Sequence, residues 1–247
     1  MIDPRYALVD KRLRAVQRVL AFCSGKGGVG KSVCSSVAGL ILARHGYRVG
    51  LLDLDFQGSS AHIFLGAELA LPEETRGIKP LLLDCGLRLM SFAAFTGERA
   101  VPLRGTDVSN AFLELLAITV WDDLEFLVID MPPGIGDEVL DVMRLIGRSE
   151  YVVVSGSSKV SALVVERLIL LLREMKTNLA GVVENMIVDP AACHVHDMAA
   201  RLKVPLLGRI RYHPQLEALI GHPDQLVQSQ FAAELSGSLT EMNVRLP

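Results

Sequence analysis

The sequence predicts an α/β fold, a single doubly wound domain with a mostly parallel sheet of seven to eight strands and helices on both faces. Short apolar runs, two of which end in aspartate, alternate with longer segments of helical spacing, as in parallel strands joined by crossover helices. Half of the 247 residues are hydrophobic, which is enough to cover such a sheet on both faces. The predicted strands lie near Val19, Val49, Leu89, Leu127, Val153, Val182 and Leu207.

The chain divides into a lead-in segment, residues 1–18, and one large domain, residues 19–247. Between Asp3 and Arg18, basic side chains alternate with apolar ones, which predicts a short amphipathic helix. Its basic side is expected to be a solvated face, with contact to acidic lipid or a partner as the alternative. Further helices are predicted up to Arg44, through Thr119 from Pro102, and from Ser161 to Met175.

A glycine-rich turn follows the first predicted strand and opens a helix. This turn has the pattern G-x-x-x-x-G-K-[ST], and strand, loop and helix are the context in which that motif binds phosphate. Glycines let the backbone turn so that its N–H groups point at a phosphate, and the helix N-terminus adds to the field. The predicted nucleotide-binding residues are Gly25, Lys26, Gly27, Gly28, Val29, Gly30, Lys31, Ser32 and Val33. Lys31 is expected to contact the β- and γ-phosphates of ATP, and Ser32 to bind Mg²⁺.

Three acids lie at the ends of predicted strands. Asp53 and Asp55 end one strand and Asp130 ends another, and ligands of open α/β sheets bind at the carboxyl ends of strands. An aspartate in the position of Asp130 holds Mg²⁺ in P-loop proteins, directly or through water. For Asp53 and Asp55 the alternative is that they only cap the next helix, near Ser59.

Lys26 gives the loop the pattern K-G-G-x-G-K-[ST], which resembles the deviant Walker A loop of the MinD, ParA, Mrp and nitrogenase iron protein class. The resemblance implies that Lys26 reaches the nucleotide of a second subunit in an ATP-bound homodimer; a solvated lysine is the alternative. The run from Asp53 to Asp55 resembles the D-x-D switch of the same class. That likeness implies that Asp55 positions the attacking water beside Mg²⁺, while Asp53 supports the metal and lysine network.

The segment from Asp130 to Asp137 reads D-M-P-P-G-I-G-D. It resembles the D-x-P-P-G-T-G-D signature of the Mrp-type ATPases, the iron–sulfur cluster carriers that include ApbC and Ind, with Ile135 in place of threonine. In this loop the prolines restrict the backbone and the glycine frees it, so Pro133 and Gly134 are expected to sense the γ-phosphate.

Two later strands also resemble this family. The run from Gly181 to Met186 is similar to its G-V-V-E-N-M strand, which implies that Asn185 hydrogen-bonds the adenine edge. A buried asparagine that caps its own loop is the alternative. The last predicted strand matches as well, but the proline that usually follows it near the base is Arg211 here.

The chain departs from the family at the cluster site, because no C-x-x-C occurs in it. Cys193 and His196 instead form a C-x-x-H pair. Two copies across a two-fold axis would supply two cysteines and two histidines, which suit Zn²⁺ or an unusual iron–sulfur cluster at a dimer interface. The alternative is a polar loop in a protein whose cluster site was lost. Cys23 and Cys34 are expected to be buried packing residues.

The resemblance implies an ATP-binding and slowly ATP-hydrolysing dimeric switch in iron–sulfur or metal-cluster assembly or transfer. Its implied partners are iron–sulfur apoproteins or other cluster-assembly proteins. One alternative is an ATP-gated, partner-specific metallochaperone or regulator that carries no cluster. Another is a MinD/ParA-like positioning or partition ATPase.

Charge argues against that last alternative. The net charge is −3, with no long Lys/Arg cluster for nucleic acid, and residues 224–247 carry more acids than bases, unlike a segment that binds acidic lipid. No apolar run has the length of a membrane span, and no signal core or paired cysteine spacing is present. The sequence therefore predicts a cytoplasmic protein with no stable membrane association.

Overall fold

The structure, a computed structural model, describes residues 3–56, 58–72, 74, 77–96 and 106–246. These residues form one eight-stranded sheet in the order β3-β4-β2-β5-β1-β6-β7-β8. Its strands are β1 (Val16–Cys23), β2 (Val49–Asp53), β3 (Leu81–Leu82), β4 (Arg88–Ser91), β5 (Leu124–Asp130), β6 (Glu150–Gly156), β7 (Asn178–Ile187) and β8 (Leu206–Arg211). Within the described ranges every strand pairing is parallel except that of β3 with β4.

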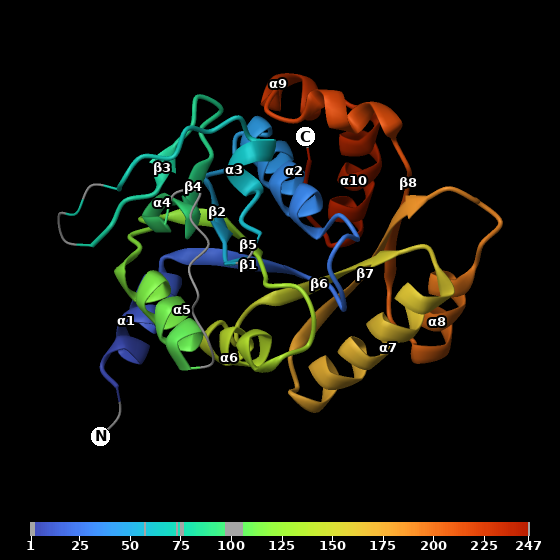
Figure 1. Cartoon of the computed structure of the whole chain (residues 1–247), viewed down its shortest axis with the longest axis horizontal. Helices are drawn as coiled ribbons and strands as arrows, with labels where there is room; N and C mark the ends of the chain where they lie inside the picture. The colour runs from blue at the N-terminus through green and yellow to red at the C-terminus, as the bar shows by residue number, and fades with distance from the viewer. Residues whose placement is uncertain (1–2, 57, 73, 75–76, 97–105, 247) are drawn as a thin grey trace.

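Helices cover both faces of the sheet (Figure 1). One layer consists of α2 (Lys31–Arg44), α3 (Ala61–Phe64), α9 (Pro223–Leu226) and α10 (Gln230–Glu241). The other consists of α1 (Arg5–Arg14), α5 (Thr106–Ile118), α6 (Asp137–Leu145), α7 (Lys159–Glu174) and α8 (His194–Leu202). The short helices α4 (Ala93–Thr96) and η1 (Pro214–Leu219) complete the described elements. The predicted doubly wound α/β fold is confirmed.

Two hydrophobic cores lie on either side of the sheet, because alternate residues of each strand face opposite layers. In β1, for example, Val19 and Ala21 belong to the core under α5 to α8, whereas Leu20 and Phe22 belong to the core under α2 and α10. Burial of the central strands on both faces accounts for their almost uninterrupted apolar sequences.

All seven predicted strands are present, and β3 is the strand that the sequence did not reveal. It contains only Leu81 and Leu82, follows a proline and pairs antiparallel at the edge of the sheet. Two residues are too few for a periodic pattern, and edge strands are commonly this short.

The predicted lead-in segment is not separate from the sheet over its whole length. Its helix, α1, ends at Arg14, and β1 begins at Val16, because Val16 and Arg18 pair with β5. Val9 and Leu13 of α1 are buried in the same core as Phe112 of α5. Lys11 and Arg14 of this segment are exposed, as expected for a solvated face, whereas Arg18 forms an ion pair with Glu150.

Two other predicted helices differ from the structure at their ends. The helix α7 begins at Lys159 instead of Ser161, because the hydroxyl of Ser158 accepts a hydrogen bond from the Ser161 N–H and caps the helix. The helix α5 begins at Thr106, and the first predicted residues of that segment, 102–105, lie outside the described residues.

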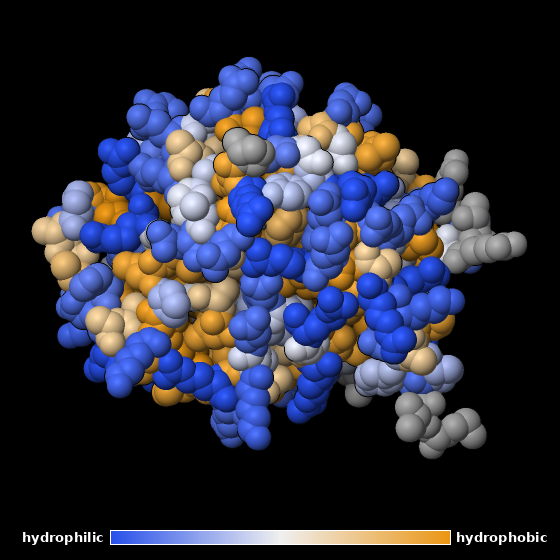
Figure 2. All heavy atoms as spheres, turned by 180° about the vertical axis from the view of Figure 1, so that it is seen from behind, coloured by the Kyte–Doolittle hydropathy of each residue, from blue (hydrophilic) through white to orange (hydrophobic). Residues whose placement is uncertain are grey.

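The surface is mixed in character. Seen from behind, hydrophilic residues cover most of it, and hydrophobic atoms gather mainly at the lower left (Figure 2). Among the described residues, no helix has both the length and the apolar character needed to cross a membrane.

Candidate functional site

The carboxyl ends of three central strands bring the predicted phosphate-binding residues together. β5 lies between β2 and β1, so that Asp130 pairs in register with Asp53 on one side and with Phe22 on the other. The glycine loop continues from the end of β1. A ligand at this edge therefore meets the loop and both strand-end acids at once.

The loop needs glycine at its last turn for two reasons. Gly30, at the start of α2, has a φ of 82°, in the left-handed region that favours glycine. A Cβ at Gly30 would also lie 2.3 Å from Nδ2 of Asn185. Gly25 is similarly confined, because its Cβ would lie 2.7 Å from the Val164 side chain of α7. The Lys26 side chain, in contrast, is exposed at the rim of the loop.

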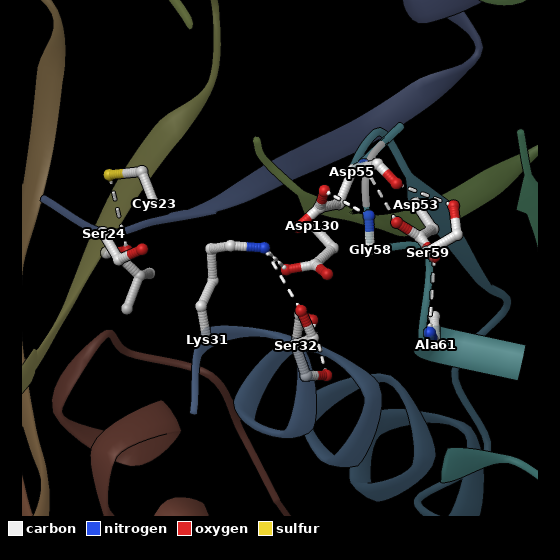
Figure 3. A network of polar contacts seen from close by, with 12 residues as sticks. Cys23, Ser24, Lys31, Ser32, Asp53, Asp55, Gly58, Ser59, Ala61 and Asp130 are labelled. Carbon is white, nitrogen blue, oxygen red and sulfur yellow. Dashed lines mark hydrogen bonds and ion pairs between the residues drawn. The ribbon is translucent and has the colours of Figure 1, made fainter. Parts of the chain in front are cut away.

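Lys31 and Asp130 form a buried ion pair. Nζ of Lys31 lies 2.6 Å from Oδ1 of Asp130 and 3.2 Å from the Ser32 hydroxyl, to which it donates (Figure 3). The other carboxylate oxygen of Asp130, Oδ2, is also buried, and no described residue forms a hydrogen bond with it. A buried carboxylate oxygen needs a partner. The Ser32 hydroxyl and Oδ2 of Asp130 therefore fit a bound Mg²⁺.

Asp53 is fully buried and anchors the turn that carries Asp55. Its carboxylate accepts hydrogen bonds from the Asp55 N–H at 3.0 Å, the Ala61 N–H at 3.3 Å and the Ser91 hydroxyl at 3.3 Å. Burial, followed by the nearby charge of Asp130, raises the pKa of Asp53 to about 7. Asp53 thus holds both the Asp55 backbone and the start of α3. Its contact with the Ala61 N–H is of the helix-capping kind that the sequence offered as the alternative role for these acids.

Asp55 lies in a hollow formed by the phosphate loop. The hollow has a volume of about 210 Å³, and Asp55 and Pro133 line it together with the loop from Lys26 to Val33. Oδ1 of Asp55 accepts a hydrogen bond from the Gly58 N–H at 3.0 Å, and the carboxylate is only half-buried. The position of Asp55 is suited to contact with water or ligand in the hollow.

The D-M-P-P-G loop closes another side of this hollow. Gly134 has a φ of 96°, and its N–H donates to the Ser24 carbonyl at 2.9 Å. Pro133, immediately before it, is exposed toward the hollow. The loop that was expected to sense the γ-phosphate is therefore hydrogen-bonded to the start of the phosphate loop.

A second hollow, of about 310 Å³, adjoins the first. Both are lined by Gly28, Gly30, Val33 and Phe64, and the second is also lined by Asn185, Met186 and residues 211–214. Asn185 is buried, and its Nδ2 donates to the Val29 carbonyl at 3.0 Å. It thus contacts the phosphate loop and not its own loop.

Arg211 lies on the wall of this second hollow, within a small polar cluster. Its Nε donates to Oε1 of Glu234 at 2.7 Å, and its N–H donates to Oε2 at 2.8 Å. His213 Nε2 lies 3.2 Å from the same Oε2. Partial burial raises the pKa of Glu234, but the hydrogen bonds from Arg211 and His213 outweigh it, so that the pKa lies below its ordinary value.

Several lining residues of the two hollows were not predicted from the sequence. They are Ser24, Ser60, Phe64, Met186, Tyr212, His213, Pro214, Leu216, Glu217, Ile220 and Phe231. His213 is the second residue after β8, and its place beyond the carboxyl end of a strand was a usable signal. Phe231 belongs to α10 and reaches the site only because that helix packs on β8 and α2.

Cys193 and His196 line neither hollow and lie at the start of α8. Both side chains are exposed, and Nδ1 of His196 lies 3.2 Å from the Asp197 carboxylate. In the part of the chain that the structure describes, no group of three or more His, Cys, Asp or Glu residues is placed to hold a metal. Cys23 and Cys34 are both buried, and burial raises the pKa of the Cys23 thiol to about 12.

Comparison with known proteins places this geometry in a family. A family model described as ParA, NUBPL iron-transfer P-loop NTPase, matches residues 15–246. The chain belongs to this family. The matched range contains the glycine loop, the strand-end acids and the whole described sheet.

Curated relatives of this NTPase carry a related name. The iron-sulfur cluster carrier protein of Saccharolobus solfataricus is 33% identical, over 90% of this chain and 83% of its own length. The iron-sulfur cluster carrier protein of Escherichia coli K12 is also 33% identical, over 83% of this chain. The matched region spans only 59% of the E. coli protein's length.

Solved structures agree with the fold. A nucleotide-binding protein of Archaeoglobus fulgidus in complex with ADP has a TM-score of 0.77 and 28% identity, over 93% of this chain and 96% of its own. The cell division ATPase MinD of Pyrococcus furiosus has a TM-score of 0.69 over 92% of this chain and 98% of its own. At 18% identity the likeness to MinD is one of fold alone.

Proposed function

We propose that this NTPase is an ATP-driven switch that binds and slowly hydrolyses ATP as a homodimer and acts in the transfer of an iron–sulfur cluster or metal ion. The observation that carries the proposal is the buried Lys31–Asp130 pair beside the glycine loop, in which Oδ2 of Asp130 has no hydrogen-bond partner among the described residues. The residues at this edge combine a cation for phosphate with oxygens suited to Mg²⁺.

The residues around the first hollow support ATP hydrolysis. Mg²⁺, when bound, neutralises phosphate charge, with the Ser32 hydroxyl and the Asp130 carboxylate as its protein partners. Lys31 stabilises charge that develops on the phosphate oxygens. Asp55, anchored through Asp53 and half-exposed in the hollow, orients the attacking water by accepting a hydrogen bond from it.

The second hollow is the proposed base site. It adjoins the phosphate loop and is lined by apolar side chains, with Asn185 and Arg211 among its polar groups. The complex of the Archaeoglobus relative with ADP supports an adenine nucleotide. In this proposal Asn185 both supports the phosphate loop and contacts the adenine edge.

In the proposed dimer, a second copy of the chain supplies a further phosphate contact and further metal ligands. Lys26 is exposed at the rim of the phosphate loop, where it is free to reach a nucleotide on a second copy. Cys193 and His196 of one chain offer two ligands, so two copies together complete a four-ligand site for zinc or a cluster as cargo. The names of the relatives support an iron–sulfur cargo, with iron–sulfur apoproteins or assembly proteins as partners.

Anaerobic iron–sulfur reconstitution tests the cargo role. We expect iron and sulfide equivalent to about half a cluster per chain in the wild-type protein, as in a cluster shared by two chains. Cys193→Ser should lose this metal, whereas Cys85→Ser, at a half-buried cysteine far from α8 in the sequence, should retain it.

The other outcomes separate the alternatives. Zinc without sulfide would indicate a metal that clips the dimer together, and no metal in any variant would remove the cargo role. An ATP-gated metallochaperone that carries no cluster would then be tested by pull-down of partner proteins with and without ATP.

A further inference from the structure

Arg209 ties the segment before Cys193 to a buried carboxylate. Its Nε donates to Oε2 of Glu184 at 2.8 Å, and its Nη2 donates to the Ala192 carbonyl at 2.9 Å and the Pro190 carbonyl at 3.3 Å. Glu184 has no exposed side-chain area, while that of Arg209 is 35% exposed. The guanidinium group therefore bridges the interior of β7 and the turn that leads into α8.

Asn185, the next residue of β7, contacts the phosphate loop on the other face of the sheet. Neighbouring residues of a strand point to opposite faces, so the Glu184 and Asn185 side chains extend in opposite directions from one piece of backbone. Nδ2 of Asn185 donates to the Val29 carbonyl and leaves no room for a Cβ at Gly30. A movement of the phosphate loop at Val29 or Gly30 thus acts directly on the backbone that carries Glu184.

The backbone just after these two residues departs from regular strand geometry. Met186 has a φ of 60°, in the left-handed region that non-glycine residues rarely adopt. The pairing of β7 with β8 shifts register between Glu184 and Ile187. Such strained residues often mark segments that change conformation.

The Glu184 carboxylate depends on Arg209, because only one of its two oxygens has a hydrogen-bond partner among the described residues. Oε1 of Glu184 is buried, and none of the described residues forms a hydrogen bond with it. A buried carboxylate that is only half satisfied depends strongly on its one cationic partner. Any displacement of Glu184 is therefore followed by the guanidinium group and by the carbonyls that it holds.

We propose that Glu184 and Arg209 are positioning residues that couple the phosphate loop to the Cys193 segment, so that a bound nucleotide changes the reactivity of the Cys193 thiol. This proposal rests on the proposed nucleotide binding, but it does not require Cys193 to carry a cluster. The link is mechanical, running from Val29 through Asn185 and Glu184 to Arg209.

The test measures the rate at which maleimide modifies Cys193, with and without Mg²⁺ and a non-hydrolysable ATP analogue. The full chain carries Cys85→Ser, because Cys85 is half-buried and could also react. Cys23 and Cys34 are buried and need no substitution. We expect the analogue to change the rate by about fivefold or more, the lower end of typical coupling between two sites. Arg209→Lys should remove this dependence, since an ammonium group cannot bridge the carboxylate and both carbonyls.

Two further variants complete the design. Arg201→Lys alters the ion pair of α8 with Glu166 of α7, away from the 190–192 carbonyls, and should retain the nucleotide dependence. Glu184→Gln should lose it, and it provides a second test if Arg209→Lys does not fold. Binding of a fluorescent ATP analogue, measured separately, should be the same in all variants.

The outcomes are distinct. A response in the wild type that is lost in Arg209→Lys or Glu184→Gln, with unchanged nucleotide binding, supports the coupling. A wild-type response retained in both variants, or no response despite bound nucleotide, overturns it while leaving the proposed function intact. Failure of the wild-type protein to bind nucleotide overturns both proposals.

Discussion

At the scale of single residues, the site depends on charges that are buried together. Lys31 and Asp130 are 5% and 0% exposed, and the ammonium group compensates a carboxylate that water cannot reach. Asp53 adds a second buried carboxyl group next to them, and its raised pKa reflects the cost of ionising it there. Ligand binding and stability are therefore linked at the same few atoms.

Lys31→Ala should abolish nucleotide binding and also destabilise the nucleotide-free protein by about 3 kcal/mol, because it leaves Asp130 buried and unpaired. Urea denaturation and titration calorimetry measure the two effects. Adding Asp130→Asn to Lys31→Ala should recover part of the stability but none of the binding. ATP affinity in Lys31→Ala equal to that of the wild type would refute the phosphate-loop assignment.

Asp55→Ala should retain ATP but lower its hydrolysis by on the order of 100-fold, the lower end of what one positioned acid–base group contributes. Steady-state phosphate release and nucleotide binding separate these two properties. Asp84→Ala, at an exposed acid in the turn between β3 and β4, is the matched control and should hydrolyse ATP normally. Unchanged turnover in Asp55→Ala would remove Asp55 from the mechanism.

Asp53 should give the nucleotide-free protein a stability that depends on pH. Its pKa is about 7 when folded and near the ordinary 3.8 when unfolded, so only the folded state holds the proton between these values. The free energy of unfolding contributed by this group should fall as the pH rises from about 4 to about 7. Urea denaturation of wild type and Asp53→Asn across this range, without Mg²⁺, should give curves that diverge; parallel curves would contradict the assignment.

At the scale of elements, local contacts set the start of two of the long helices. Ser158 and Ser229 cap α7 and α10 with their hydroxyl groups, and both helices begin directly after the capping serine. The C-terminus of α8 instead ends at Lys203, which has a left-handed φ of 53°. A residue with a Cβ adopts this conformation at a steric cost that glycine does not have. This end of α8 is therefore less stable than a glycine cap would make it.

Lys203→Gly should stabilise the protein by about 1 kcal/mol, because glycine adopts the left-handed conformation without a steric cost. Chemical denaturation of the two proteins measures the difference. Ala200→Gly, at an exposed position within the same helix, is the opposite control and should cost about 1 kcal/mol. A loss of stability in Lys203→Gly would show that this lysine contributes contacts that outweigh its conformation.

At the scale of the whole molecule, the two hollows form where segments far apart in the sequence meet at one edge of the sheet. The phosphate loop follows β1, Asp53 and Asp130 end β2 and β5, and the second hollow is lined by the segment after β8 and by Phe231 of α10. The exposed rim of this edge, including Lys26, is where a second copy would complete the nucleotide site.

The proposed dimer predicts a nucleotide-dependent change in mass. Sedimentation should show that Mg²⁺ with a non-hydrolysable ATP analogue converts the wild-type protein into a dimer. Lys26→Ala should bind the analogue yet dimerise at least about tenfold more weakly, since one charged contact to phosphate is lost on each side. The control Lys79→Ala, at an exposed lysine outside both hollows, should dimerise like the wild type. Equal dimerisation of Lys26→Ala would exclude a trans contact.

The sequence by itself determined the fold class and seven of the eight strands in the described residues, and it predicted the phosphate loop. These features depend on short-range patterns, namely apolar runs of strand length and glycine spacing at a strand–helix turn. The sequence did not predict the strand β3, because two residues are too few to show a periodic pattern.

Only the tertiary structure decided which side chains meet. Lys31 and Asp130 are 99 residues apart, and Asn185 and Val29 are 156 apart, yet each pair is in hydrogen-bond contact. The sequence also contained no sign that Arg209 bridges Glu184 and the Cys193 segment. Such contacts arise when the order and register of the strands bring distant residues to one edge, and this depends on the packing of the whole sheet against its helices.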